Sequence, residues 1–183
     1  MREYTSPAVT ELPPDARLTN TVFTRAAEEP DAVMFRRLED GQWRDVTCAE
    51  FHRDVVRIAK GLIAAGIEHG DRVALMSRTR YEWTVIDYAI WTIGGVTVPI
   101  FDSSSEEQVH WILSDSGSKA AFVEHGDHAA RVKAVADRLP DLGEVWQIEG
   151  DDLTRLAESG ADELLDHSVV VALVRDLWRV SGF

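Results

Sequence analysis

Four residues about two thirds of the way along the chain have side chains that could hold a metal ion. Glu124, His125, Asp127 and His128 supply the carboxylate and imidazole groups that bind zinc. Two histidines three residues apart share a metal only when both lie on one helix face, and Gly126 indicates a loop between a strand and a helix. We therefore expect a solvated loop and a helix cap here, and we predict no metal site.

The acidic and hydroxyl run from Asp102 to Ser105 follows an expected strand and precedes an expected helix, where exposed backbone N–H groups can bind an anion. Glu106 and Glu107 come next, and two carboxylates in the first turn complement the helix dipole but repel phosphate. N-capping is therefore favoured over anion binding. Gly94-Gly95 follows a helix and precedes a strand, the reverse of a nucleotide loop, so it is interpreted as a helix end.

Cys48 is the one cysteine, which rules out an internal disulfide. It falls in the first turn of an expected helix, where the dipole lowers a thiol pKa, but the sequence shows no histidine relay and we predict no nucleophile. His52 and His110 are interpreted as surface or boundary residues. Four aromatic residues suggest a lipid-binding face, but helical spacing and aliphatic neighbours favour core packing: Trp83, Tyr88, Trp91 and Trp111. We predict no catalytic, cofactor-binding or metal-binding residue in this chain.

Strands and helices alternate along most of the chain. A helix from Thr19 and a hairpin turning at Asp40-Gly41 are followed by a helix with a Thr47 capping box, whose apolar stripe is expected to pack on a sheet. The elements expected next are strand 72–77, helix 80–93, strand 96–100, helix 105–114, strand 119–123, helix 127–139, strand 144–148 and one more helix within 151–160. This order predicts an α/β fold with a mainly parallel sheet and helices on both faces.

Composition narrows the class of protein. The chain has 183 residues, 45% hydrophobic and 28% charged, which is typical of a folded globular domain. Its formal charge of −13 argues against nucleic acid as a partner. The amino terminus has no apolar core of the signal-peptide kind, and the apolar stretch from Trp83 to Ile93 contains Asp87 and is too short to span a bilayer. We expect a cytoplasmic protein without a transmembrane segment.

Three motifs, in this order and spacing, are similar to the adenylate-forming superfamily and most closely to its long-chain fatty acyl-CoA synthetases. They are Gly66-Ile67-x-x-Gly70-Asp71-Arg72-Val73, Ser77-x-Thr79-Arg80-x-Glu82-Trp83 and Val98-Pro99-x-x-Asp102-Ser103-Ser104. The resemblance covers roughly residues 18 to 150, and it implies an incomplete amino-terminal subdomain of that fold. It also implies the family reaction, in which a fatty acid and ATP form an acyl-adenylate that is then passed to coenzyme A.

The resemblance stops before the family's catalytic motifs. Adenylation needs a Gly/Ser/Thr-rich phosphate loop followed by a lysine, and no such loop is present. The resemblance places the family's Thr-Glu pair, ribose-binding Asp and lid Lys downstream of residue 183. We therefore expect this chain to be inactive alone and to bind no cofactor itself, whereas the full-length family enzyme requires ATP, Mg²⁺ and coenzyme A.

Three parts are expected along the chain. Residues 1–18 form a proline-rich irregular arm, and residues 19–160 form a partial AMP-binding, acyl-CoA synthetase amino-terminal domain. The tail at 161–183 has conflicting signals, because Val169 to Val171 favour a strand while Leu173, Leu177 and Val180 share one helix face. The loss of resemblance after about Gly160 motivates the hypothesis that the tail is coded out of frame.

Two other functions are kept open. The first is a non-catalytic interaction or regulatory module that pairs with a full-length relative. The second is a nucleotide-binding flavodoxin-like domain, which is least favoured because no strand is followed by a Gly-rich phosphate turn. Uncovering part of a larger fold exposes apolar surface, so self-association is also expected.

Overall fold

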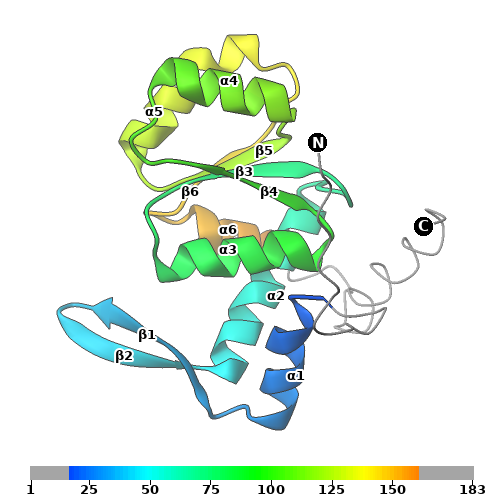
Figure 1. Cartoon of the computed structure of the whole chain (residues 1–183), viewed down its shortest axis with the longest axis vertical. Coiled ribbons are helices and arrows are strands. Elements are labelled where there is room, and N and C mark those ends of the chain that lie inside the picture. The colour runs from blue at the N-terminus through cyan, green and yellow to red at the C-terminus, as the bar shows by residue number, and fades with distance from the viewer. Residues whose placement is uncertain (1–16, 161–183) are drawn as a thin grey trace, which may run out of the picture.

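The computed structural model describes residues 17–160, which form a four-stranded parallel sheet covered on both faces by helices, and a separate two-stranded β-hairpin (Figure 1). The sheet has the order β4-β3-β5-β6. Its strands are β3 (Arg72–Met76), β4 (Val96–Ile100), β5 (Ala120–Val123) and β6 (Val145–Gln147). All three strand pairings are parallel. The α/β class with a parallel sheet is confirmed.

The helices are α1 (Asn20–Glu28), α2 (Cys48–Ala64), α3 (Tyr81–Thr92), α4 (Glu106–Ser116), α5 (Gly126–Val135) and α6 (Asp152–Ser159). A 3₁₀ turn, η1 (Ala136–Arg138), follows α5 and covers part of the longer helix expected there. The hairpin consists of β1 (Val33–Glu39) and β2 (Gln42–Thr47), paired antiparallel.

Alternation along the buried strands divides the core into two clusters. Val73, Leu75 and Phe122 point to the face covered by α3 and α6, while Met76 and Val123 point to the face covered by α4 and α5 (Figure 1). Strands whose residues are buried on both faces are typical of parallel sheets. Burial on both sides explains why these short strands read as continuous apolar runs.

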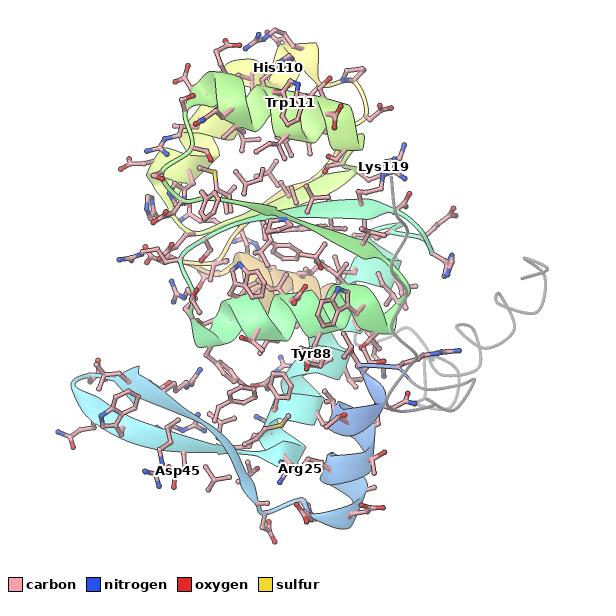
Figure 2. The ribbon with its side chains drawn as sticks, viewed as in Figure 1. Arg25, Asp45, Tyr88, His110, Trp111 and Lys119 are labelled. Carbon is pink, nitrogen blue, oxygen red and sulfur yellow. The ribbon has the colours of Figure 1, made fainter. Side chains whose placement is uncertain are left out.

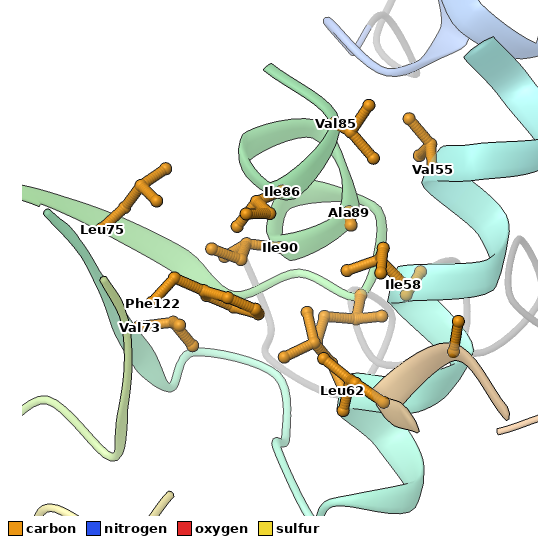
Figure 3. Packing of buried hydrophobic residues seen from close by; sticks show 14 of the residues in the cluster. Val55, Ile58, Leu62, Val73, Leu75, Val85, Ile86, Ala89, Ile90 and Phe122 are labelled. Carbon is orange, nitrogen blue, oxygen red and sulfur yellow. The ribbon is translucent and has the colours of Figure 1, made fainter. Parts of the chain in front are cut away.

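Helix α2 forms a further layer. Its apolar stripe was expected to pack on the sheet, but α2 contacts mainly α3, α6 and α1. Its stripe residues join those of α3 and the sheet in one cluster (Figure 3). Gly61 lets the α2 backbone approach α6, since a Cβ at that position would lie 2.2 Å from the carbonyl oxygen of Leu156. The expectation of direct sheet packing was therefore wrong for most of α2.

Local chemistry fixes the element ends as expected. Asp40 and Gly41 both have positive φ, 49° and 76°, as the two central residues of a type I′ hairpin turn require. Thr47 caps α2, with reciprocal bonds to Glu50. Gly94, at φ 75°, follows the end of α3, which confirms that the glycine pair ends a helix.

Some predictions fall outside the described residues. The arm at 1–18 lies there except for Arg17 and Leu18, and the tail at 161–183 lies there entirely. The strand and helix alternatives for the tail therefore stay predictions. Within residues 17–160, no helix has both the length and the apolar character needed to cross a membrane.

Candidate functional site

The carboxyl ends of β3 and β5 mark the switch point of the sheet. The chain leaves β3 to form β4 on one side of it, and then returns to form β5 on the other side. In open α/β sheets the crevice outside such a pair of strand ends is where ligands bind. Ser77 and Arg78 follow β3 at this crevice, and Glu124 follows β5.

The carboxylate of Glu124 fills the crevice. Arg78 donates its backbone N–H to Oε2 at 2.8 Å, and its Nη2 and Nε donate to Oε1 at 2.8 and 3.1 Å. Ser77 Oγ lies 3.3 Å from Oε2, and Arg80 Nη1 lies 3.6 Å from Oε1. The Glu124 side chain is only 1% exposed. A buried carboxylate with this many donors is the arrangement in which a charge is tolerated inside a protein.

Opposing effects set the charge of Glu124. Burial alone would raise its pKa, but the hydrogen bonds from the Arg78 side chain and backbone, with the charges of Arg78 and Arg80, lower the pKa to about 2. Glu124 is thus ionised throughout the neutral range. Its oxygens accept hydrogen bonds from the backbone N–H and the guanidinium of Arg78, so these donors are satisfied within the chain.

Further polar contacts lie beside the pairing of Glu124 with Arg78. Arg80 Nε donates to Glu82 at 2.7 Å and its Nη1 reaches Glu149 at 3.3 Å. The hydroxyl of Tyr81 donates to Asp54 on α2 at 2.9 Å. Burial first, and then the Asp54 charge and hydrogen bond, raise the pKa of Tyr81. These contacts attach the start of α3 to α2 and to the segment that follows β6.

An open cleft of about 860 Å³ lies between the hairpin and the start of α3, and we refer to it as the hairpin cleft. Phe35, Leu38 and Trp43 line it on the hairpin side, and Thr79 and Tyr81 line it on the side of the sheet. Four arginines contribute to its walls: Arg36, Arg37, Arg78 and Arg80. Three glutamates do so as well: Glu39, Glu82 and Glu124. The volume lies in the range of ligand pockets.

The candidate metal ligands are not brought together around one point. Glu124 is committed to Arg78, and His125 is the N-cap residue of α5. His128 is buried at 3% exposure, so the expectation of a solvated position was wrong for this residue. Its ring stacks on that of His125 with centroids 3.9 Å apart, and burial first, then His125 and Arg131, lower its pKa. Among residues 17–160, no group of three or more potential ligands is placed to hold a metal.

The Asp102 to Ser105 segment acts as a cap. Ser105 accepts from the Gln108 backbone N–H at 3.4 Å, and Gln108 Oε1 accepts from the Ser105 N–H at 2.9 Å, which confirms N-capping of α4. Arg131 on α5 donates to the carbonyl oxygens of Asp102 and Ser104 at 2.8 and 2.9 Å. The segment is therefore tied to α5 through its carbonyl groups.

The remaining candidate residues from the sequence either pack within the fold or lie on its surface. Cys48 is the first residue of α2 and is fully buried. The ring of His52 makes an edge contact with Phe23 at 5.0 Å, and His110 is half-buried on α4. Core packing is confirmed for Trp83 and Tyr88, which pack partly buried against the main cluster, and Trp91 contacts Tyr88 at 5.2 Å. It was wrong for Trp111, which is 65% exposed on α4 (Figure 2).

Sequence reasoning considered Glu124 only as a metal ligand and missed its pairing with Arg78. The available signal was positional, since Glu124 and Arg78 each follow a short apolar strand. Side chains at the carboxyl ends of neighbouring parallel strands meet at one edge of the sheet. Which strands are neighbours was not evident from the order of elements alone.

Comparison with known proteins gives consistent matches. The profile of the AMP-binding enzyme family matches residues 22–175. The long-chain-fatty-acid–CoA ligase FadD15 of Mycobacterium bovis is 44% identical over 164 residues, covering 88% of this chain and 27% of the relative. The uncharacterized protein Rv1549 of Mycobacterium tuberculosis is 30% identical over 112 residues, covering 60% of this chain and 61% of that protein. The chain thus spans about a quarter of the length of FadD15.

Solved structures share the fold. A long-chain-fatty-acid-CoA ligase (FadD1) from Archaeoglobus fulgidus superposes with a TM-score of 0.72 at 17% identity, covering 88% of this chain and 33% of that one. The N-terminal domain of FACL13 from Mycobacterium tuberculosis superposes with a TM-score of 0.68 at 28% identity, covering 81% of this chain and 37% of that one. In each case this chain corresponds to only part of the larger protein.

Proposed function

Because this chain belongs to the AMP-binding enzyme family, we propose that it forms the amino-terminal α/β part of a long-chain fatty acid–CoA ligase. The observation that carries the proposal is the 44% identity to FadD15 across 88% of the chain. The reaction of such a ligase is ATP-dependent activation of a long-chain fatty acid to an acyl-adenylate, followed by transfer of the acyl group to coenzyme A.

The switch crevice supports the view that the nucleotide is bound elsewhere in the full-length ligase. The β3–α3 and β5–α5 connections lack a Gly-rich turn, and the Arg78 backbone N–H and guanidinium between them already donate to Glu124. In this proposal the described part of the chain is a scaffold, while ATP, Mg²⁺ and coenzyme A are bound by other segments of the full-length ligase. The 183-residue chain is then inactive alone.

A chimera tests the proposal. Residues 1–160 of this chain replace the corresponding segment of FadD15, and pyrophosphate release is measured with ATP, coenzyme A and a long-chain fatty acid. We expect activity in the chimera, none in FadD15 lacking the segment, and none in the 183-residue chain. Activity in the 183-residue chain, or a folded but inactive chimera, would refute the proposal.

A second candidate is a non-catalytic module that pairs with a full-length relative. Rv1549 favours it, because the matched region makes up 61% of that protein, compared with 27% of FadD15. Light scattering after size-exclusion chromatography of this chain mixed with FadD15 tests the pairing. A joint peak together with a changed ligase rate would support the module, and independent elution with an unchanged rate would exclude it.

A further inference from the structure

Two side chains of α5 hold the connection between β4 and α4. Arg131 Nη1 donates to the carbonyl oxygens of Asp102 and Ser104 at 2.8 and 2.9 Å. His128 makes a hydrogen bond to the backbone of Asp102. Residues three apart on a helix lie on the same face, so both side chains reach residues 102–104 from one side of α5. We refer to His128 and Arg131 as the α5 clasp, and α5 lies beside α4 over one face of the sheet (Figure 1).

The position of His128 suits a neutral ring and not a charged one. The residue is 3% exposed, and among residues 17–160 its Nδ1 has no hydrogen-bond partner. A backbone carbonyl only accepts hydrogen bonds, so the nitrogen that bonds to Asp102 is Nε2 and carries the proton of the neutral ring. A second proton would enter on Nδ1, where the described residues offer no acceptor. A buried donor without an acceptor destabilises the folded state.

The charges around His128 also oppose a second proton. His125, whose ring stacks on that of His128 with centroids 3.9 Å apart, and Arg131 on the same helix are basic groups that face it. Glu124 at the end of β5 is an acidic group that favours the charged ring, but both of its oxygens already accept hydrogen bonds. From the β4–α4 connection, Asp102 presents its backbone. Burial and the two basic neighbours therefore outweigh the carboxylate.

We propose that the α5 clasp is acid-sensitive: when Nδ1 of His128 takes up a proton from solvent, the ring leaves its buried position and residues 102–104 separate from α5. Histidine is the side chain whose charge ordinarily changes between pH 5 and 8. Because β4 pairs with β3, the segment lies beside the residues that follow β3, and the charge of Asp102 acts on Arg78. Opening therefore reaches the switch crevice. This device goes beyond the proposed function and does not depend on ligase activity.

Amide hydrogen exchange of the full 183-residue chain, followed by NMR at pH 7.0 and pH 5.5, tests the proposal. The amides of Ser104 and Gln108 report on the segment, because they donate hydrogen bonds to Phe101 and Ser105 at 3.0 and 3.4 Å. The opened ring has its ordinary pKa of 6.5, so the open form gains as the pH falls through this value. After correction for intrinsic rates, we expect the two amides to open up to about eightfold more at pH 5.5.

A reference amide and a matched pair of variants locate the effect. The Ile67 amide, which donates to the Leu62 carbonyl at 3.0 Å beyond the end of α2, should open equally at both pH values. His128→Gln keeps an amide donor for Asp102 but cannot titrate, so it should lose the increase at pH 5.5. His110→Gln, on α4 and outside the clasp, should keep it (Figure 2). A uniform change in all amides, or an increase that persists in His128→Gln, would overturn the proposal.

A second variant tests the cluster without changing His128 itself. His125→Gln removes the basic ring that stacks on His128. An NMR titration of the carbon-bound ring hydrogens of His128 should have its midpoint below 6.5 in the wild type, and that midpoint should move upward in His125→Gln. A wild-type midpoint at or above 6.5, or a midpoint that does not move in the variant, would overturn the proposal.

Discussion

Replacing Glu124 with glutamine tests how much the buried, ionised carboxylate stabilises the fold. The substitution keeps the shape of the side chain and removes its charge. The pKa of Glu124 falls from 4.5 to about 2, and each pKa unit corresponds to about 1.4 kcal/mol of differential interaction between the two protonation states. The full shift thus corresponds to about 3 kcal/mol. Because the Arg78 side chain is 68% exposed, water screens part of this, and we expect Glu124→Gln to lower the free energy of unfolding by roughly 2 to 3 kcal/mol at neutral pH.

The pH dependence gives the sign of the effect. A carboxyl group whose pKa is depressed by folding contributes its full stabilisation above its unfolded pKa, here 4.5, and loses it as the pH falls through the folded value of about 2. The difference between wild type and Glu124→Gln should therefore shrink to roughly half at pH 3. Urea unfolding followed by circular dichroism at pH 7 and pH 3 measures both differences.

The control for this experiment is Glu107→Gln. Glu107 pairs with Arg138 at 3.0 Å, but its side chain is 76% exposed. An exposed pair contributes at most about 1 kcal/mol, so this variant should unfold close to the wild type. Equal losses for the two variants at pH 7, or a Glu124→Gln difference that does not change between pH 7 and pH 3, would refute the reasoning.

Three further predictions concern packing, capping and burial. Gly61→Ala forces a Cβ against the Leu156 carbonyl, so we expect the free energy of unfolding in urea to fall by about 1 to 3 kcal/mol. The control is Gly143→Ala, whose Cβ meets nothing closer than 3.4 Å and which should lower that free energy far less. Similar losses in the two variants would contradict the close approach of α2 and α6. Ser105→Ala removes the cap of α4 and should cost about 1 kcal/mol in the same assay, and an unchanged midpoint would show that the capping box contributes nothing. The raised pKa of Tyr81 predicts that one tyrosine stays protonated when the pH rises above 10. A titration of phenolate absorbance should therefore show a late ionisation step in the wild type that is missing in Tyr81→Phe. Persistence of the late step in this variant would assign it to another tyrosine.

The sequence predicted most accurately those features that depend on residues close together in the chain. The capping pair of Thr47 and Glu50 and the positive-φ turn at Asp40-Gly41 act over two to four residues, and both are found as expected. Short apolar runs between helices also identified the parallel strands correctly. In each case the side chains or backbone positions that decide the structure stand close together in the chain.

What the sequence could not predict depends on contacts between distant residues. The pairing of Arg78 with Glu124 joins residues 46 positions apart and requires β5 to lie beside β3. The burial of His128 and the exposure of Trp111 depend on which side of α5 and α4 meets the sheet, and the apolar character of a tryptophan does not decide this. The same holds for α2, whose apolar stripe meets helices as readily as strands.

The close approach of α2 and α6 has a practical consequence for shortening the chain. A Cβ on Gly160 would lie 2.5 Å from the backbone nitrogen of Gly61, so the end of α6 rests directly on α2. A version cut after β6 would lack Leu156 and Ala157, both buried, and would leave their side of the main core open to water. We therefore expect the smallest stable fragment found by limited proteolysis or expression trials to end after Gly160.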